Sequence, residues 1–205
     1  MRVAVLGAGS VGTSLAAGLR RGGHEVAVGV RSPKDGRHSH VEGVTSIAGA
    51  VGGAAAVVLA VPVGALEELV PSLPLSASQV VVDATNAVAG PVPGGADTVG
   101  AFVRSLVPDG VAVVKAFNTI GAEHLGDGRI DGARAFLPVA GDAAGLGTVV
   151  DLARGIGFDA VALGGMDAVG MVESHARLWI HLMRSGWGRD FGFAVVGAPA
   201  RAEAG

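Results

Sequence analysis

The hydrophobic positions of the chain fall into short runs separated by polar and glycine-rich segments. Continuous apolar runs predict strands at residues 2–6, 25–30, 56–61, 79–83 and 111–116, with weaker ones at 135–140 and 159–163. Apolar residues at helical spacing predict helices at residues 10–21, 65–70, 98–107, 143–156 and 166–184. Strands that are apolar along their whole length are typical of parallel sheets covered on both faces. We therefore expect a doubly wound α/β fold with a mostly parallel sheet.

Composition narrows the class of protein. Glycine accounts for 35 of the 205 residues, only 16% are charged and the mean hydropathy is +0.53, which excludes disorder. The net charge of −3, without a basic stripe, argues against nucleic-acid binding. The absence of cysteine excludes disulfides and thiolate chemistry. Glycines interrupt the apolar stretch 3–19 and Pro62 the stretch 47–66, so we expect no signal peptide, no membrane span and a cytoplasmic protein.

The first predicted strand runs directly into the motif Gly-Ala-Gly-Ser-Val-Gly at residues 7–12, and a predicted helix follows. This G-x-G-x-x-G pattern between a strand and a helix is typical of dinucleotide binding. Gly7 would permit the tight turn, Gly9 the approach of a pyrophosphate, and Gly12 close packing of the helix on the strand. The alternative is that the glycines serve only a tight connection.

The end of the second predicted strand indicates which dinucleotide is bound. NAD sites usually carry an acidic residue there, but this strand ends in Arg31 and Ser32. Arg31 can bond a 2′-phosphate through a charge-assisted fork, Ser32 can add a hydroxyl donor, and Lys34 adds positive charge. These residues favour NADP(H) over NAD(H). The alternative is an ordinary solvated basic loop.

The carboxyl ends of the later strands are the expected place for the rest of the ligand. Small residues and proline there would let a flat ring lie against the backbone, and the amide and hydroxyl groups could bond ribose or the nicotinamide carboxamide. The candidates are Ala60, Val61, Pro62, Asn86, Ala116, Asn118 and Thr119. As alternatives, Asn86 caps a turn, Asn118 caps a helix, and Lys115 is a solvated strand end.

Four segments of the chain resemble the NADPH-dependent coenzyme F-420 reductases, also called deazaflavin-dependent NADP oxidoreductases. They are residues 1–7, the Gly-Val-Arg-Ser at 29–32, the Lys-Ala-Phe-Asn-Thr at 115–119 and the Val-Glu-Ser at 172–174. The third segment also resembles the reductase domain of eukaryotic membrane ferrireductases. The resemblance implies a Rossmann-type domain with a small C-terminal helical subdomain, and a homodimer.

The resemblance also implies an activity. Members of this family move a hydride between the nicotinamide C4 of NADP(H) and the C5 atom of coenzyme F-420, an 8-hydroxy-5-deazaflavin. It places Ser10, Val11, Arg31 and Ser32 on NADP-binding positions. The cofactors carry this chemistry, so we expect no catalytic acid or base.

We expect the NADP-binding domain to span residues 1–140, a C-terminal subdomain with the substrate pocket and dimer contact to span 141–197, and residues 198–205 to be a frayed tail. The helix 166–184 is apolar over a wide arc, which predicts packing onto the sheet and, as a sharper hypothesis, contact with a second subunit. Glu173 and Arg177 are spaced for an ion pair on its surface. No histidine pair has zinc-site spacing, so we expect no metal.

Two other functions fit the same residues. One is an NADPH-dependent reductase of a different compact or planar acceptor, such as a flavin, a ferric complex or an imine, because the chain is short for a large helical substrate domain. The other is a non-catalytic NADP(H)-binding module, because a phosphate-binding turn alone does not establish catalysis.

Overall fold

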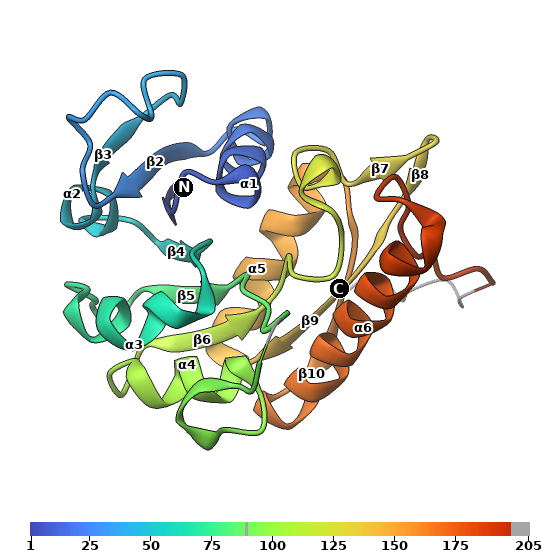
Figure 1. Ribbon diagram of the computed structural model, residues 1–205. Helices are drawn as coiled ribbons and strands as arrows, with labels where there is room; N and C mark the ends of the chain where they lie inside the picture. Colours follow the sequence, from blue (N-terminus) through green and yellow to red (C-terminus); the bar gives the residue numbers. More distant parts are fainter. Residues whose placement is uncertain (89, 198–205) are drawn as a thin grey trace, which may run out of the picture.

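The structure, a computed structural model, describes residues 1–88 and 90–197, and within them a single eight-stranded sheet forms the centre of the fold (Figure 1). Its strands are β1 (Arg2–Leu6), β2 (Glu25–Val30), β3 (Val44–Ser46), β4 (Ala56–Leu59), β5 (Val80–Asp83), β6 (Ala112–Lys115), β9 (Phe136–Gly141) and β10 (Asp159–Gly164). They lie in the order β10-β9-β6-β5-β4-β1-β2-β3. Strands β1 to β6 are parallel and follow the 3-2-1-4-5-6 order of dinucleotide-binding sheets.

Helices cover both faces of this sheet. They are α1 (Ser10–Arg21), α2 (Ile47–Val51), α3 (Leu66–Leu69), α4 (Val99–Leu106), α5 (Ala143–Ile156) and α6 (Val169–Leu182). Val3 and Val5 of β1 pack in one core with α1 and α5, whereas Ala4 and Leu6 pack in a second core with α2, α3 and α4. Burial on both faces explains why the strands read as continuous apolar runs.

Helix α6 packs on the sheet separately, through Val169 and Val172 against Ala140 of β9. It continues into a wide π-type turn at Met183–Trp187. Short 3₁₀ turns occupy residues 63–65, 70–72, 93–95, 122–124 and 166–168. In the described part of the chain, no helix is long and apolar enough to cross a membrane.

The predicted fold class is confirmed: the molecule is a Rossmann-like α/β fold with a C-terminal helix. Three features had no sequence signal: the short edge strand β3, the hairpin of β7 (Arg129–Ile130) and β8 (Ala133–Arg134), and the direction of β9. Strand β9 runs antiparallel to β6, with Lys115 opposite Ala140. The boundary at residue 140 stays a prediction, and the expected tail at 198–205 lies outside the described residues.

Candidate functional site

The turn from β1 into α1 needs glycine at two of its three motif positions on steric grounds. Gly7 has a φ of 113°, and a Cβ there would lie 2.3 Å from the carbonyl oxygen of Ala60. A Cβ on Gly12 would lie 2.0 Å from the carbonyl oxygen of Gly7. A Cβ on Gly9, in contrast, would meet no atom within 4 Å. Gly9 therefore borders open space at the start of α1, where backbone N–H groups can face a phosphate.

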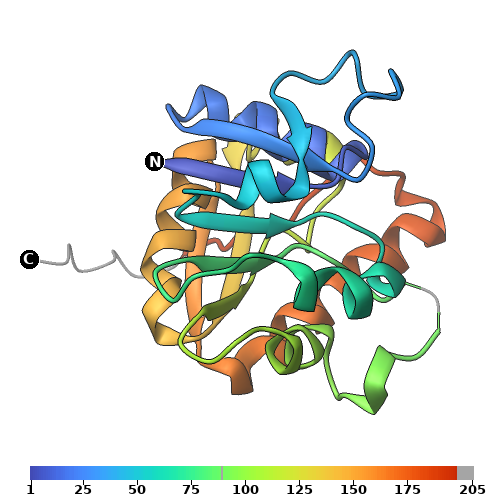
Figure 2. The same ribbon diagram turned by 90° about the vertical axis from the view of Figure 1, so that its left-hand side faces the viewer.

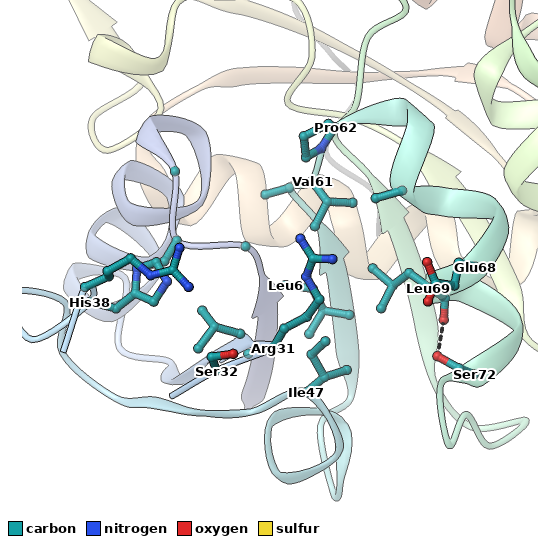
Figure 3. A pocket seen from close by; sticks show the side chains of 18 residues that line it. Leu6, Arg31, Ser32, His38, Ile47, Val61, Pro62, Glu68, Leu69 and Ser72 are labelled. Carbon is teal, nitrogen blue, oxygen red and sulfur yellow. Dashed lines mark hydrogen bonds between the residues drawn. The ribbon is translucent and has the colours of Figure 1, made fainter. Parts of the chain in front are cut away.

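A cleft of about 640 Å³ opens beside this turn (Figure 3). Its walls come from the carboxyl ends of β1, β2 and β4 and from the helical segment that follows β4. Seven of the predicted site residues line it, namely Gly7, Gly9, Arg31, Ser32, Ala60, Val61 and Pro62. The sheet order places the cleft where the strand order reverses, between β1 and β4, which is the usual ligand position in such sheets.

The wall formed after β2 carries the positive charge of the cleft. Arg31, Arg37 and His38 line it, and in Figure 3 the Arg31 side chain extends across the cleft toward Val61. Asp35 fixes Arg37 by accepting from its Nε at 2.7 Å and from its backbone N–H at 3.1 Å. The Arg37 guanidinium holds the pKa of the Asp35 carboxyl below its usual range. Arg37 is thus paired within the connection, whereas Arg31 has no ion-pair partner among the described residues.

The opposite wall was not predicted. It is formed by residues of α2, of α3 and of the flanking turns, which are Ile47, Ala65, Glu68, Leu69 and Ser72. Glu68, Leu69 and Ser72 stand together on one side in Figure 3, where the Ser72 hydroxyl donates to the Leu69 carbonyl at 2.7 Å. In the sequence, the only signal for Glu68, Leu69 and Ser72 is their position after the carboxyl end of β4.

Other predicted residues lie near the turn but outside this lining. Ser10 borders an adjoining hollow of about 550 Å³ beside Thr13 and His40. Val11 packs against the core, Gly12 is buried, and Lys34 is exposed on the connection after β2. Their proposed contacts with the dinucleotide stay predictions.

The ends of β5 and β6 bring a second group of predicted residues together. The Asn86 side-chain amide donates to the Asn118 carbonyl at 2.6 Å, and the Asn118 amide donates to Asn86 Oδ1 at 3.1 Å. Asn118 and Thr119 are 5% and 2% exposed, and Ala116 is fully buried. Asn118 Oδ1 and Thr119 Oγ1 have no hydrogen-bond partner among the described residues. Both oxygens are buried at the edge where a ligand is expected.

Beneath this edge lies an ionic cluster that sequence reasoning missed. Lys115 Nζ is 2.8 Å from Asp83 Oδ2 and 3.3 Å from Glu173 Oε1, and all three residues are buried. The alternative of Lys115 as a solvated strand end is therefore wrong. The expected surface pair of Glu173 with Arg177 is also wrong, because Glu173 turns inward and Arg177 donates to the Ser174 hydroxyl. The described residues include no cluster of three or more His, Asp or Glu side chains suited to a metal ion.

The first part of the chain matches a known protein family. Residues 2–87 match the model of the family described as NADP oxidoreductase coenzyme F420-dependent. The chain is an NADP-dependent oxidoreductase. The matched segment contains the glycine turn, Arg31 and the wall after β4, and it confirms the resemblance seen in the sequence.

Solved structures agree with this assignment. The oxidoreductase is 27% identical to a protein of Arthrobacter sp. FB24 whose name provisionally assigns it to the F420-dependent NADP-reductases, with a TM-score of 0.75 over 95% of this chain and 99% of that one. A hypothetical protein of Sinorhizobium meliloti is 29% identical, with a TM-score of 0.70 over 83% and 88% of the two chains. No curated protein matches the sequence.

A more distant similarity concerns the fold alone. A reductive aminase of Aspergillus terreus, solved in complex with NADPH and ethyl levulinate, is 15% identical with a TM-score of 0.66. The alignment covers 89% of the oxidoreductase but 61% of the aminase. The common part is the Rossmann-like sheet with its helices.

Proposed function

We propose that the oxidoreductase transfers a hydride between the nicotinamide C4 of NADP(H) and the C5 atom of coenzyme F-420. The observation that carries the NADP(H) part is the cleft itself, in which a glycine turn and a wall with Arg31, Arg37 and His38 face the same space. The family match and the similarity to the Arthrobacter protein support the deazaflavin as the second substrate.

The adenosine half would occupy the 640 Å³ cleft. The pyrophosphate would lie against Gly9, at the start of α1, where the absence of a Cβ leaves room. The 2′-phosphate would lie between Arg31 and Ser32, with Arg37 and His38 adding donors from the same connection. Asp35 neutralises Arg37 in part, so Arg31 would supply most of the positive charge at this phosphate.

The nicotinamide would lie at the ends of β4, β5 and β6. Pro62 lines the cleft on the side toward this edge, and the Asn86–Asn118 pair lies at the ends of the next two strands. Asn118 Oδ1 and Thr119 Oγ1 both lack a partner but are buried, so a carboxamide N–H₂ group would reach them only after a local rearrangement of this edge. In this placement Ala116 supports the ring from below instead of touching it, because its side chain is fully buried.

The protein's contribution to the reaction would be mainly geometric. Direct hydride transfer between two rings depends on bringing the donor and acceptor carbons together in the right orientation. The cofactors supply the reacting atoms, and the chain binds, orients and shields them. This transfer requires no general acid or base from the chain.

The test mixes the purified protein with NADPH and coenzyme F-420 and follows the deazaflavin absorbance. We expect bleaching that depends on both the enzyme and NADPH. Parallel reactions with flavin mononucleotide, a ferric chelate and a cyclic imine measure the other acceptors. Tight NADPH binding without turnover of any acceptor would instead support a binding module, and faster turnover of another acceptor would replace the deazaflavin in the proposal.

The cofactor preference has its own test in Arg31→Ala. Hydrogen bonds to charged groups contribute about 1.5–3 kcal/mol, so NADPH affinity should fall about tenfold to a hundredfold. NADH affinity should change little, because NADH lacks the 2′-phosphate. The matched control is Arg134→Ala, an exposed arginine of β8 outside the cleft lining. Equal weakening of both dinucleotides, measured by fluorescence titration, would refute the role of Arg31.

A further inference from the structure

The buried cluster of Asp83, Lys115 and Glu173 contains more negative than positive charges. One ammonium group stands against two carboxylates, which leaves a formal charge of −1 inside the protein. The side chains of Asp83 and Lys115 are fully buried, and that of Glu173 is 7% exposed. Among the ion pairs of the described residues, neither carboxylate has a second cationic partner.

The remaining contacts of the cluster are neutral. Asp83 Oδ1 accepts from the N–H and the hydroxyl of Thr85 at 2.9 and 2.6 Å, and Lys115 also donates to the Thr85 carbonyl at 2.7 Å. Glu173 Oε1 accepts from the N–H of Gly100 at 3.0 Å, in the first turn of α4. The partial positive charge of that helix start offsets the excess in part. A net negative potential remains, poorly screened because water is excluded.

The cluster lies at the carboxyl ends of β5 and β6, where Asp83 pairs with Lys115 as the last residues of their strands. The chain leads from these two residues to Asn86 and Asn118, at the edge proposed for the nicotinamide. We propose that the excess negative charge of this cluster stabilises the oxidised nicotinamide relative to the reduced one, and so makes bound NADPH a stronger hydride donor. This inference rests on the proposed function.

The charge balance of the reaction explains the effect. When the C4–H bond of the dihydronicotinamide breaks, the hydride leaves with both bonding electrons, and the neutral ring becomes a pyridinium with a charge of +1. The acceptor ring gains the hydride at its reacting carbon and a proton from solvent at a ring nitrogen. A fixed negative charge near the nicotinamide therefore favours the product state of the donor. Acting over roughly 10 Å at an effective dielectric constant of about 20, one charge changes such an equilibrium about tenfold.

The decisive variant is Glu173→Gln. It removes one negative charge but keeps an oxygen that can accept from the Gly100 N–H, as Oε1 does now, and that can remain beside the Lys115 ammonium group. The measurement is the dissociation constant of NADP⁺ and of NADPH for each protein. We expect the ratio of the NADP⁺ constant to the NADPH constant to rise about threefold to tenfold, because only the cationic ring loses an attraction. Asp151→Asn, which neutralises an exposed carboxylate on α5, should leave the ratio unchanged.

A second variant, Asp83→Asn, removes the other carboxylate charge beside Lys115. It keeps Oδ1 as the acceptor for the N–H and the hydroxyl of Thr85. Thermal unfolding and binding of NADPH establish that each variant is folded. A purely structural role would weaken both forms of the dinucleotide together and leave the ratio within twofold, which would overturn this inference alone. If the unmodified protein bound neither form, the proposed function would fail as well.

Discussion

Replacing Lys115 with methionine should destabilise the protein more than most single substitutions. Methionine is similar in length to the lysine stem, so the change removes the charge without leaving a large cavity. Both carboxylates would then be buried without a cation, and Lys115 Nζ would no longer donate to the Thr85 carbonyl. Breaking a buried ion pair by removing one partner costs about 3–5 kcal/mol. This is a large share of the 5–15 kcal/mol that is typical of a folded domain.

Urea denaturation provides the measurement. The midpoint should fall while the slope of the free energy of unfolding with urea stays the same, because the surface exposed on unfolding is unchanged. Lys34→Met is the matched control, since Lys34 is exposed, and its midpoint should stay close to that of the unmodified protein. Adding Asp83→Asn and Glu173→Gln to the Lys115→Met chain should recover part of the loss, because no unpaired charge then remains. A loss below about 1 kcal/mol for Lys115→Met would show that the cluster is not electrostatically coupled as the distances indicate.

Two further predictions concern the glycines of the turn after β1 and the imidazole of His175. Gly12→Ala should lower the melting temperature, because its Cβ would lie 2.0 Å from the Gly7 carbonyl oxygen. Gly9→Ala should keep the melting temperature and lose NADPH affinity, because its Cβ would enter the open space proposed for the pyrophosphate. Calorimetry with NADPH titration checks both variants, and equal melting temperatures would contradict the steric reasoning. Burial lowers the pKa of the His175 imidazole below its ordinary 6.5, so the native state favours the neutral ring and loses stability as the pH falls below about 6.5. His175→Phe should therefore lose less stability between pH 7 and pH 5 than the unmodified protein, and the exposed His181→Phe should follow the unmodified protein.

The parallel part of the fold could be predicted because strands that are buried on both faces read as continuous apolar runs. The helices α1 and α5 have the bounds that the apolar spacing predicts. Strand β3 has three residues and is only half-buried, so no apolar run marks it. The antiparallel direction of β9 depends on how the preceding segment returns to the sheet, which local pattern does not encode.

Some residues of the candidate site could likewise be predicted from the sequence, and others could not. The glycine turn and Arg31 could be found because each has a local reason, a backbone conformation in one case and the missing acidic residue in the other. The buried cluster could not, because Asp83, Lys115 and Glu173 are distant in sequence and meet only after β5, β6 and α6 have packed. Helical spacing alone pairs Glu173 with Arg177, which shows how a local rule fails when a carboxylate faces the core.

The reversal of β9 has a consequence for how this fold can vary. Because β9 runs antiparallel to β6, the chain needs no crossover between them, and residues 116–135 return to the sheet from the edge at which β6 ends (Figures 1 and 2). Insertions or deletions in this segment, which includes the β7–β8 hairpin, would reshape the border of the site while the register of the parallel strands stayed the same. Because this segment begins with Ala116, Asn118 and Thr119, such changes would act on the edge proposed for the nicotinamide and leave the cleft beside the glycine turn in place.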